Sequence, residues 1–203
     1  MQSDKITVGS DETGLSEALL EAERFGAFMN LNERDLRRLR LLSEETLGMA
    51  RAITADFVAD FWLEGDKEGN CRVCLTVKTA MDYAKKSELI EVATNKSNAA
   101  SVGIMGKIRD MMENCLYAQN YANSFVGDYC SASPAGLNSG CLWSLNQYRR
   151  KTQEEFPNED NDDFNPALDE LEKSIVAHIA DEITVAVKGN TAQMIIEKNF
   201  GKH

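Results

Sequence analysis

The sequence has no long apolar run and no surplus of basic residues. No stretch approaches the roughly 18 consecutive apolar residues that a membrane-spanning helix needs, so we expect no membrane protein. The 203 residues include 33 acidic and 22 basic ones, which gives a net charge of −11. A general binder of the nucleic-acid backbone needs basic residues to displace counterions, so we also expect no nucleic-acid partner.

Histidine and cysteine are too few for the common metal and disulfide frameworks. The chain has two histidines and an odd count of five cysteines. Cys71 and Cys74 have the spacing of half a zinc site, but they fall in a predicted strand, where residues three apart point to opposite faces. The three aspartates within residues 160–163 lack the glycine and the final glutamate of a calcium loop. We therefore expect buried, reduced thiols and no metal.

The first residues contain neither the apolar segment nor the cleavage motif of a secretory signal, so we expect a cytoplasmic protein. The hydrophobic fraction of 43% and the charged fraction of 27% are typical of globular chains, and the length allows a substantial core. We expect one domain over residues 1–203, with a variable insert around 123–166 that is rich in polar and acidic residues.

Hydrophobic periodicity predicts helices and strands in groups rather than in strict alternation. The expected strands cover residues 5–8, 56–65 and 70–79, followed by two alternating runs around Gly189-Asn190. The expected helices cover residues 14–30, 33–53, 82–93, a segment from Val102 onward, and 166–183. Grouping of this kind predicts an α+β fold, a two-layer α/β sandwich with a mixed or antiparallel sheet and helices on one face.

Two ends of these helices carry recognisable local signals. Asn32 is a good N-cap for the helix over 33–53, with Asp35 at the third helical position. His178 lies beside an apolar stripe that includes Ile175, in the helix predicted over 166–183. We expect this histidine to be partly buried and structural rather than catalytic.

The helix predicted over 33–53 carries two adjacent glutamates, Glu44 and Glu45, away from its apolar stripe. At about 100° per residue, each lies roughly 130° from the centre of the stripe, on opposite sides. Gly48 follows one turn after Glu44, although glycine costs about 1 kcal/mol of helix stability relative to alanine. Close approach of a ligand would explain this glycine, and a solvated helix face with one small residue is the simpler alternative.

A second candidate site is the run Gly103-Ile-Met-Gly106-Lys107 at the start of a predicted helix. Free N–H groups at a helix start favour anions, glycine lets the backbone approach a phosphate closely, and Lys107 adds positive charge. The run is shorter than a P-loop and no Gly-Lys-Ser/Thr follows it. A close crossing of two helices is the alternative explanation for the glycines.

Taken in order, these segments resemble the GHKL ATPase fold of histidine kinases, and most closely its branch of small anti-sigma-factor serine kinases. The resemblance rests on the runs ITVGS, LLSEETLGM and GIMGK, on the hairpin between the last two, and on the final strand pair. It implies a histidine-kinase-like ATPase fold and an ATP-binding regulatory protein of bacterial-type signalling, with ATP and Mg²⁺ as cofactors. Glu44 and Glu45 would then be the catalytic candidates. The implied nucleotide-binding residues are Gly48, Gly103, Gly106 and Lys107.

The sequence also departs from the family. Where the family places an Asn that holds Mg²⁺, four residues after its Glu, this chain has Gly48 or Met49. The Asp-x-Gly-x-Gly box that reads adenine is absent. Activity as an ATPase or as a serine or histidine kinase therefore stays open. The alternatives are a protein-interaction module that binds no nucleotide, as a homodimer or with a regulatory partner, and a phosphotransferase with rearranged catalytic residues.

Overall fold

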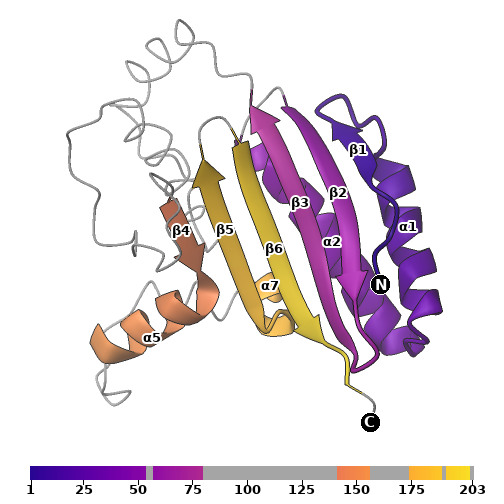
Figure 1. Ribbon diagram of the computed structural model, residues 1–203. Coiled ribbons are helices and arrows are strands. Elements are labelled where there is room, and N and C mark those ends of the chain that lie inside the picture. The colour runs from indigo at the N-terminus through magenta and orange to yellow at the C-terminus, as the bar shows by residue number, and fades with distance from the viewer. Residues whose placement is uncertain (54–56, 80–140, 156–173, 189–190, 202–203) are drawn as a thin grey trace, which may run out of the picture.

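The computed structural model contains one antiparallel sheet with helices packed on one of its faces (Figure 1). It describes residues 1–53, 57–79, 141–155, 174–188 and 191–201, and the structural statements below concern these residues. In chain order the elements are β1 (Ile6–Gly9), α1 (Leu15–Phe28), α2 (Glu33–Ile53), β2 (Phe57–Gly65), β3 (Asn70–Thr79), β4 (Cys141–Ser144), α5 (Leu145–Glu155), α7 (Ile175–Ile179), β5 (Glu182–Lys188) and β6 (Thr191–Asn199). None of the described helices is long and apolar enough to cross a membrane.

The six strands follow the order β1-β2-β3-β6-β5-β4, and every neighbouring pair is antiparallel. Both predicted hairpins form, because β2 pairs with β3, and Lys188 stands opposite Thr191 across a two-residue connection. At the centre of the sheet β3 pairs with β6, where Arg72 lies opposite Glu197, 125 positions later in the chain. The α+β class and the antiparallel sheet are therefore confirmed.

One face of the sheet is apolar and buried, because alternation sends every second side chain of the central strands toward the helices. A row of four such residues crosses the strands, and none of them is more than 3% exposed: Phe61, Leu75, Met194 and Val185. Helix α2 lies across this face and adds its own apolar stripe (Figure 1). The buried apolar residues of α2 are Leu39, Leu42, Leu47, Met49 and Ala50.

The helices α1 and α2 form where the periodicity predicts them. Asn32 caps α2, since its side-chain oxygen accepts from the Asp35 N–H over 3.0 Å while its amide donates to the Asp35 carboxylate over 2.8 Å. Arg38 donates to the other carboxylate oxygen of Asp35 over 3.0 Å, so this 6% exposed acid is fully engaged. The predicted cap is confirmed.

The helix predicted over residues 166–183 is helical, within its described part, only from Ile175 to Ile179. Ser174 has an extended backbone, and its hydroxyl accepts from the Ala177 N–H, so it caps the short helix α7. Glu182 and Ile183 already belong to β5, where they pair with β6. Pairing with a central strand outweighs the local helical pattern here.

The apolar stripe expected beside His178 is wrong at Ile175, although Ile179 packs against the core. Ile175 is 55% exposed, and His178 is exposed rather than partly buried. Val176, Ala177 and Ala180 enter the core instead, each at most 4% exposed. The short helix α7 is therefore turned differently from the long helix that the periodicity predicts.

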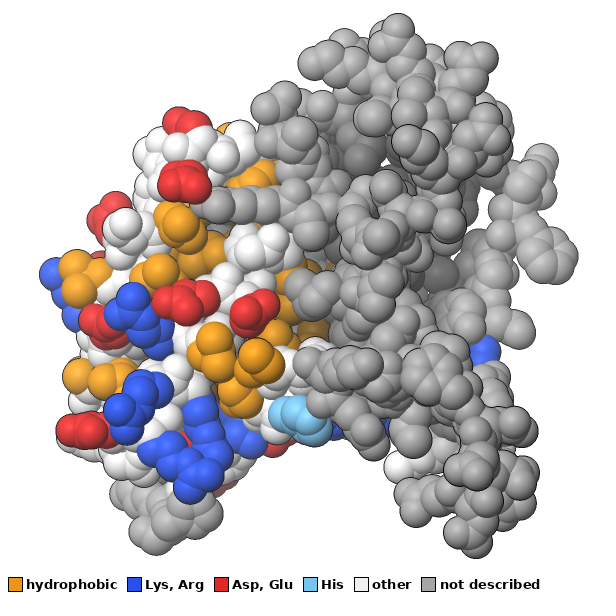
Figure 2. Space-filling model, turned by 180° about the vertical axis from the view of Figure 1, so that it is seen from behind, with side chains coloured by type: hydrophobic (Ala, Val, Ile, Leu, Met, Phe, Trp, Pro, Cys, Tyr) orange, Lys and Arg blue, Asp and Glu red, His pale blue; other side chains and the backbone are white. Residues whose placement is uncertain are grey.

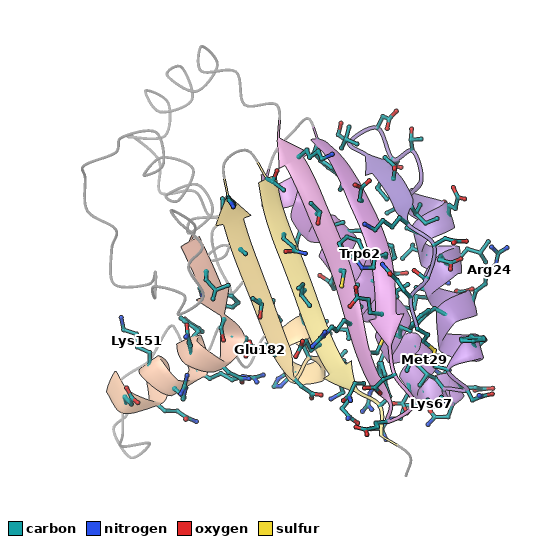
Figure 3. All side chains as sticks on the ribbon, viewed as in Figure 1. Arg24, Met29, Trp62, Lys67, Lys151 and Glu182 are labelled. Atoms are coloured by element: carbon teal, nitrogen blue, oxygen red, sulfur yellow. The ribbon has the colours of Figure 1, made fainter. Side chains whose placement is uncertain are left out.

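The second face of the sheet, which we call the open face, carries no helix in the described part of the chain (Figure 1). Trp62 lies on it, within β2 (Figure 3). The register places Cys74 and then Ile195 beside Trp62 across the strands. Figure 2 shows the opposite, helical side, where acidic, basic and apolar side chains are interspersed. The two faces of the sheet therefore differ in cover, since helices pack on only one of them in the described part of the chain.

Candidate functional site

Glu44 lies on the exposed side of α2 and takes part in an ion pair. Arg40 Nε donates to Glu44 Oε1 over 3.0 Å, and Nη1 of the same guanidinium donates to Glu23 on α1. The charges of Glu23, Arg40 and Glu44 therefore connect the two helices at their surface. Exposed pairs of this kind each contribute less than about 1 kcal/mol.

In the family, a metal-binding Asn occupies the position that corresponds to Gly48 or to Met49 in this chain. These two positions point in different directions from α2. Gly48 is exposed, and no heavy atom beyond its own helix turn and chain neighbours lies within 4 Å of the position that a Cβ would take. Met49 is only 1% exposed, so it points into the core, whereas its frame partner Glu45 is half-buried. Only the frame of Glu44 and Gly48 has both positions at the surface.

The remaining predicted site residues, Gly103, Gly106 and Lys107, lie outside the described residues. Their proximity to Glu44 and Gly48 stays a prediction. The described part of the predicted site thus consists of one ion-paired carboxylate and one exposed glycine on α2.

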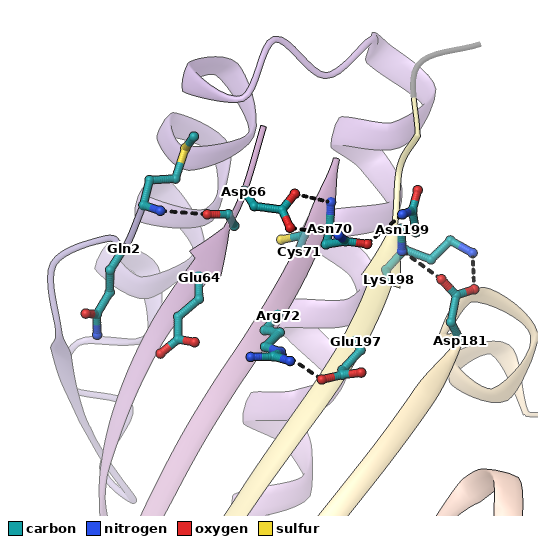
Figure 4. A pocket seen from close by; sticks show the side chains of 12 residues that line it. Gln2, Glu64, Asp66, Asn70, Cys71, Arg72, Asp181, Glu197, Lys198 and Asn199 are labelled. Carbon is teal, nitrogen blue, oxygen red and sulfur yellow. Dashed lines mark hydrogen bonds and ion pairs between the residues drawn. The ribbon is translucent and has the colours of Figure 1, made fainter. Parts of the chain in front are cut away.

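A hollow of about 800 Å³ lies at one end of the sheet, at the turn between β2 and β3 and beside the end of β6 (Figure 4). Residues 1–2, the start of β3 and Asp181 complete its lining. Its charged side chains are Glu64, Asp66, Arg72, Asp181, Glu197 and Lys198. No local sequence pattern predicts a site here, because these segments meet only through the pairing of β3 with β6.

The charges that line the hollow are partly paired. Arg72 Nε donates to Glu197 Oε1, and Lys198 Nζ donates to Asp181 Oδ1, each over 2.7 Å. Glu64 forms no ion pair within the described part of the chain; its Oε1 accepts from the Trp62 indole N–H over 2.9 Å. Carboxylates outnumber basic side chains, so the hollow has an acidic character.

Asp66 organises the turn that forms one wall of the hollow. The side-chain amide of Asn70 donates to its carboxylate over 2.7 Å, and the backbone N–H groups of Glu68 and Asn70 donate over 2.8 and 3.0 Å. These hydrogen bonds, the one from the Asn70 side chain first, lower the pKa of Asp66 below its usual value. Gly69 has a φ of +90°, which few other residues adopt, so the turn depends on this glycine.

Cys71 and Cys74 are buried free thiols on opposite faces of β3, as the spacing predicts. Burial raises the pKa of each thiol to about 12, and the next largest cause is Cys74 for Cys71 and Glu64 for Cys74. Such a thiol is protonated at neutral pH and is therefore neither a nucleophile nor a ready metal ligand. Within the described ranges, no group of three or more His, Cys, Asp or Glu side chains could hold a metal ion.

Comparisons of this chain with protein-family models, with curated proteins and with solved structures find no match. The resemblance to the GHKL fold thus stays a prediction from short motifs and element order.

Proposed function

We propose that this chain is a non-catalytic protein-interaction module that binds its partner through the open face of the sheet. The observation that carries the proposal is the lack of any described helix on a sheet face that holds a tryptophan. Antiparallel sheets often leave one face to solvent, but that face is then mainly polar. Here the 55% exposed Val58 and the partly exposed Ile195 add apolar surface, around a Trp62 that is only 8% exposed.

The composition of the open face supports an interface. Interfaces combine an apolar centre, enriched in aromatic residues, with a charged and solvated rim. On this face Trp62 and Ile195 stand in the same row of the register, while Arg72 lies toward one end of the strands and Lys78 toward the other. A partner that covers the centre would meet charged side chains at both ends.

The environment of Glu44 supports the lack of catalysis. Its carboxylate is engaged with Arg40, which also pairs with α1. Magnesium binds through oxygen ligands, and Gly48 offers no side chain where the family has its Asn. The exposed frame on α2 therefore supplies one carboxylate and no second ligand.

A quantitative pull-down with the purified chain as bait tests the module. We expect the variant Glu44→Gln/Glu45→Gln to retain a specific partner, and Ile195→Lys on the open face to lose it. Addition of Mg-ATP should not change the amount of partner that is bound. Circular dichroism of each variant verifies that it is folded. Retention by Ile195→Lys combined with loss in the α2 variant would contradict the proposal.

Nucleotide binding is the second candidate function, favoured by one observation. Gly48 lies on the exposed side of α2, one turn after Glu44, with open space where its side chain would be. A nucleotide could approach the helix there, provided that Gly103, Gly106 and Lys107 supply the phosphate contacts that the sequence predicts. The catalytic alternative adds Glu44 or Glu45 as the group beside the attacking hydroxyl.

Calorimetric and thermal-shift titrations with Mg-ATP and ADP test this candidate. Binding raises the melting temperature as nucleotide exceeds its dissociation constant. Gly48→Trp fills the open space and should abolish the shift, whereas Gly48→Ala should keep it and stabilise the helix by up to about 1 kcal/mol. No response at millimolar nucleotide rules out the candidate, and unchanged turnover in Glu44→Gln and Glu45→Gln rules out the catalytic version.

A further inference from the structure

The charges on the open face are sorted along the direction of the strands. One row, which we call the acidic row, lies at the end with the hollow and consists of Glu64, Arg72, Glu197 and Glu182. Its three carboxylates and one guanidinium leave two negative charges in excess. The row at the other end, the lysine row, consists of Val58, Lys78, Thr191 and Lys188. Its two lysines leave two positive charges in excess.

The lysine row has no balancing charge of its own. Lys78 and Lys188 are exposed, and neither forms an ion pair with another residue of the described ranges. Val58 beside them is 55% exposed. Along β3, Lys78 is six positions from Arg72, which corresponds to roughly 20 Å in a strand. The two rows are therefore separate patches of opposite sign.

The surface between the two rows is nearly neutral. It holds one basic and one acidic side chain, Lys5 and Asp60. The other side chains of these middle rows are apolar, thiol, hydroxyl or amide groups: Trp62, Cys74, Ile195, Thr184, Ser144, Thr7, Thr76, Gln193, Ala186 and Leu142. Two such surfaces can pack face to face at the roughly 10 Å spacing of sandwiched sheets.

We propose that the partner on the open face is a second copy of this chain, related by a two-fold axis that runs across the strands. This axis reverses the strand direction, so the acidic row of each copy lies over the lysine row of the other. An axis parallel to the strands would instead stack rows of like charge, which costs several kcal/mol. The contact is self-complementary, as two-fold interfaces must be.

The hollow fits the same arrangement. Glu64, Arg72 and Glu197 line it, and it is open enough for long side chains to enter. The axis lays each strand over its own copy, so Lys188 of one copy lies over Glu182 of the other, and Lys78 lies over Arg72 with the carboxylates of Glu64 and Glu197 on either side. Val58 is covered in the same contact. The inference rests on the proposed function, because it names the occupant of the same surface.

Sedimentation velocity of charge-reversed variants tests the proposal. We expect the wild-type chain to form a dimer whose affinity falls as salt rises. Lys78→Glu/Lys188→Glu and Glu64→Lys/Glu197→Lys each place like charges together, so each should weaken the dimer about tenfold or more. An equimolar mixture of the two variants should form a heterodimer, because rows of opposite charge then lie over each other at both halves of the contact.

The matched control is Arg24→Glu/Arg37→Glu, which changes net charge as much as the lysine variant does. Both arginines are exposed on the helices, with side chains 68% and 76% accessible, and this control should remain a dimer. Circular dichroism verifies that all variants are folded.

Three outcomes overturn the inference: a monomeric wild type at high micromolar concentration, a dimer that tolerates both reversals, or a mixture that stays monomeric. None of them by itself removes the proposed function. If the chain still captures a different partner and Ile195→Lys abolishes that binding, the proposed interaction module is retained. Only the second copy of the chain is then wrong as its partner. If no partner depends on Ile195, the proposed function fails as well.

Discussion

The ammonium group of Lys5 lies over the ring of Trp62, with Nζ 4.6 Å from the ring centroid. The indole N–H of the same tryptophan donates to Glu64, so both the face and the edge of the ring have polar partners. Trp62 is only 8% exposed although it stands on the open face. The segment before β1 is thereby attached to β2, the strand next to this edge of the sheet.

This contact predicts an energetic coupling between Lys5 and Trp62. Cation–π pairs near the surface contribute about 0.5–1 kcal/mol, so a double-mutant cycle of Lys5→Ala and Trp62→Leu should show coupling of that size in urea unfolding. Lys67 in the β2–β3 turn is an exposed lysine for the control cycle and should show no coupling. Equal coupling for both lysines would contradict the contact.

The connection between α1 and α2 predicts that Arg40 matters more than Glu44. Arg40→Ala breaks two ion pairs and Glu44→Ala breaks one, yet each should lower the free energy of unfolding by about 1 kcal/mol or less, because all three groups are exposed. Both effects should shrink at high salt. Arg37→Ala, which removes a looser pair with Glu33 inside α2, is the control. A loss above about 2 kcal/mol in Glu44→Ala would show that the carboxylate does more than join helices.

Burial of Cys71 and Cys74 predicts that neither reacts in the folded chain. In a background with Cys115, Cys130 and Cys141 replaced by serine, a thiol reagent at mildly alkaline pH should label neither cysteine until denaturant is added. Labelling of one thiol in the native protein would mean that its side of β3 opens to solvent.

The raised thiol pKa values also predict a loss of stability at high pH. The unfolded thiol ionises near 9.0, whereas the folded thiol stays protonated up to about 12, so the folded state binds more protons in this window. Stability contributed by the buried thiols is therefore complete below pH 9 and falls as pH rises toward 12. Denaturant titrations should show a steeper alkaline decline in the wild type than in Cys71→Ala/Cys74→Ala. Parallel declines would contradict the burial.

The turn around Asp66 predicts a contribution in acid. Because hydrogen bonds from Asn70 and the turn backbone lower the pKa of Asp66 from 3.8, its stabilisation is present above that value and is lost as pH falls through the folded pKa. Thermal melts at decreasing pH should show a smaller acid loss in Asp66→Asn than in the wild type. Glu68→Gln, in the same turn, should lose as much thermal stability in acid as the wild type does. A smaller loss in that control would contradict the assignment to Asp66.

Local patterns predict the first part of the fold well. The elements β1, α1, α2 and the β2–β3 hairpin follow from periodicity, capping and turn residues that lie within the segments themselves. The end of the helix predicted over 166–183 fails, because Glu182 and Ile183 pair with Glu197 and Ile196 across the hairpin. Neither β4 nor α5 is predicted, since their order depends on contacts with β5.

Among the candidate surfaces, too, some features follow from local sequence patterns and others do not. The exposure of Glu44 follows from the helical period, and so does the burial of Met49 beside the stripe of α2. The hollow and the two charged rows do not follow from any local pattern, because Arg72 and Glu197 meet only after β3 has paired with β6. A sequence pattern can identify alternation within a strand, but it cannot identify the neighbouring strand.

The central position of β6 has a consequence for how the chain folds during synthesis. All other described strands precede β6, so β3 keeps an unpaired edge while the residues between them emerge. Pairing across more than a hundred residues is slow, because the intervening loop must close first. Unpaired strand edges are sites of intermolecular aggregation. Until β6 arrives, β3 is therefore the strand of the nascent sheet that most needs protection by a chaperone.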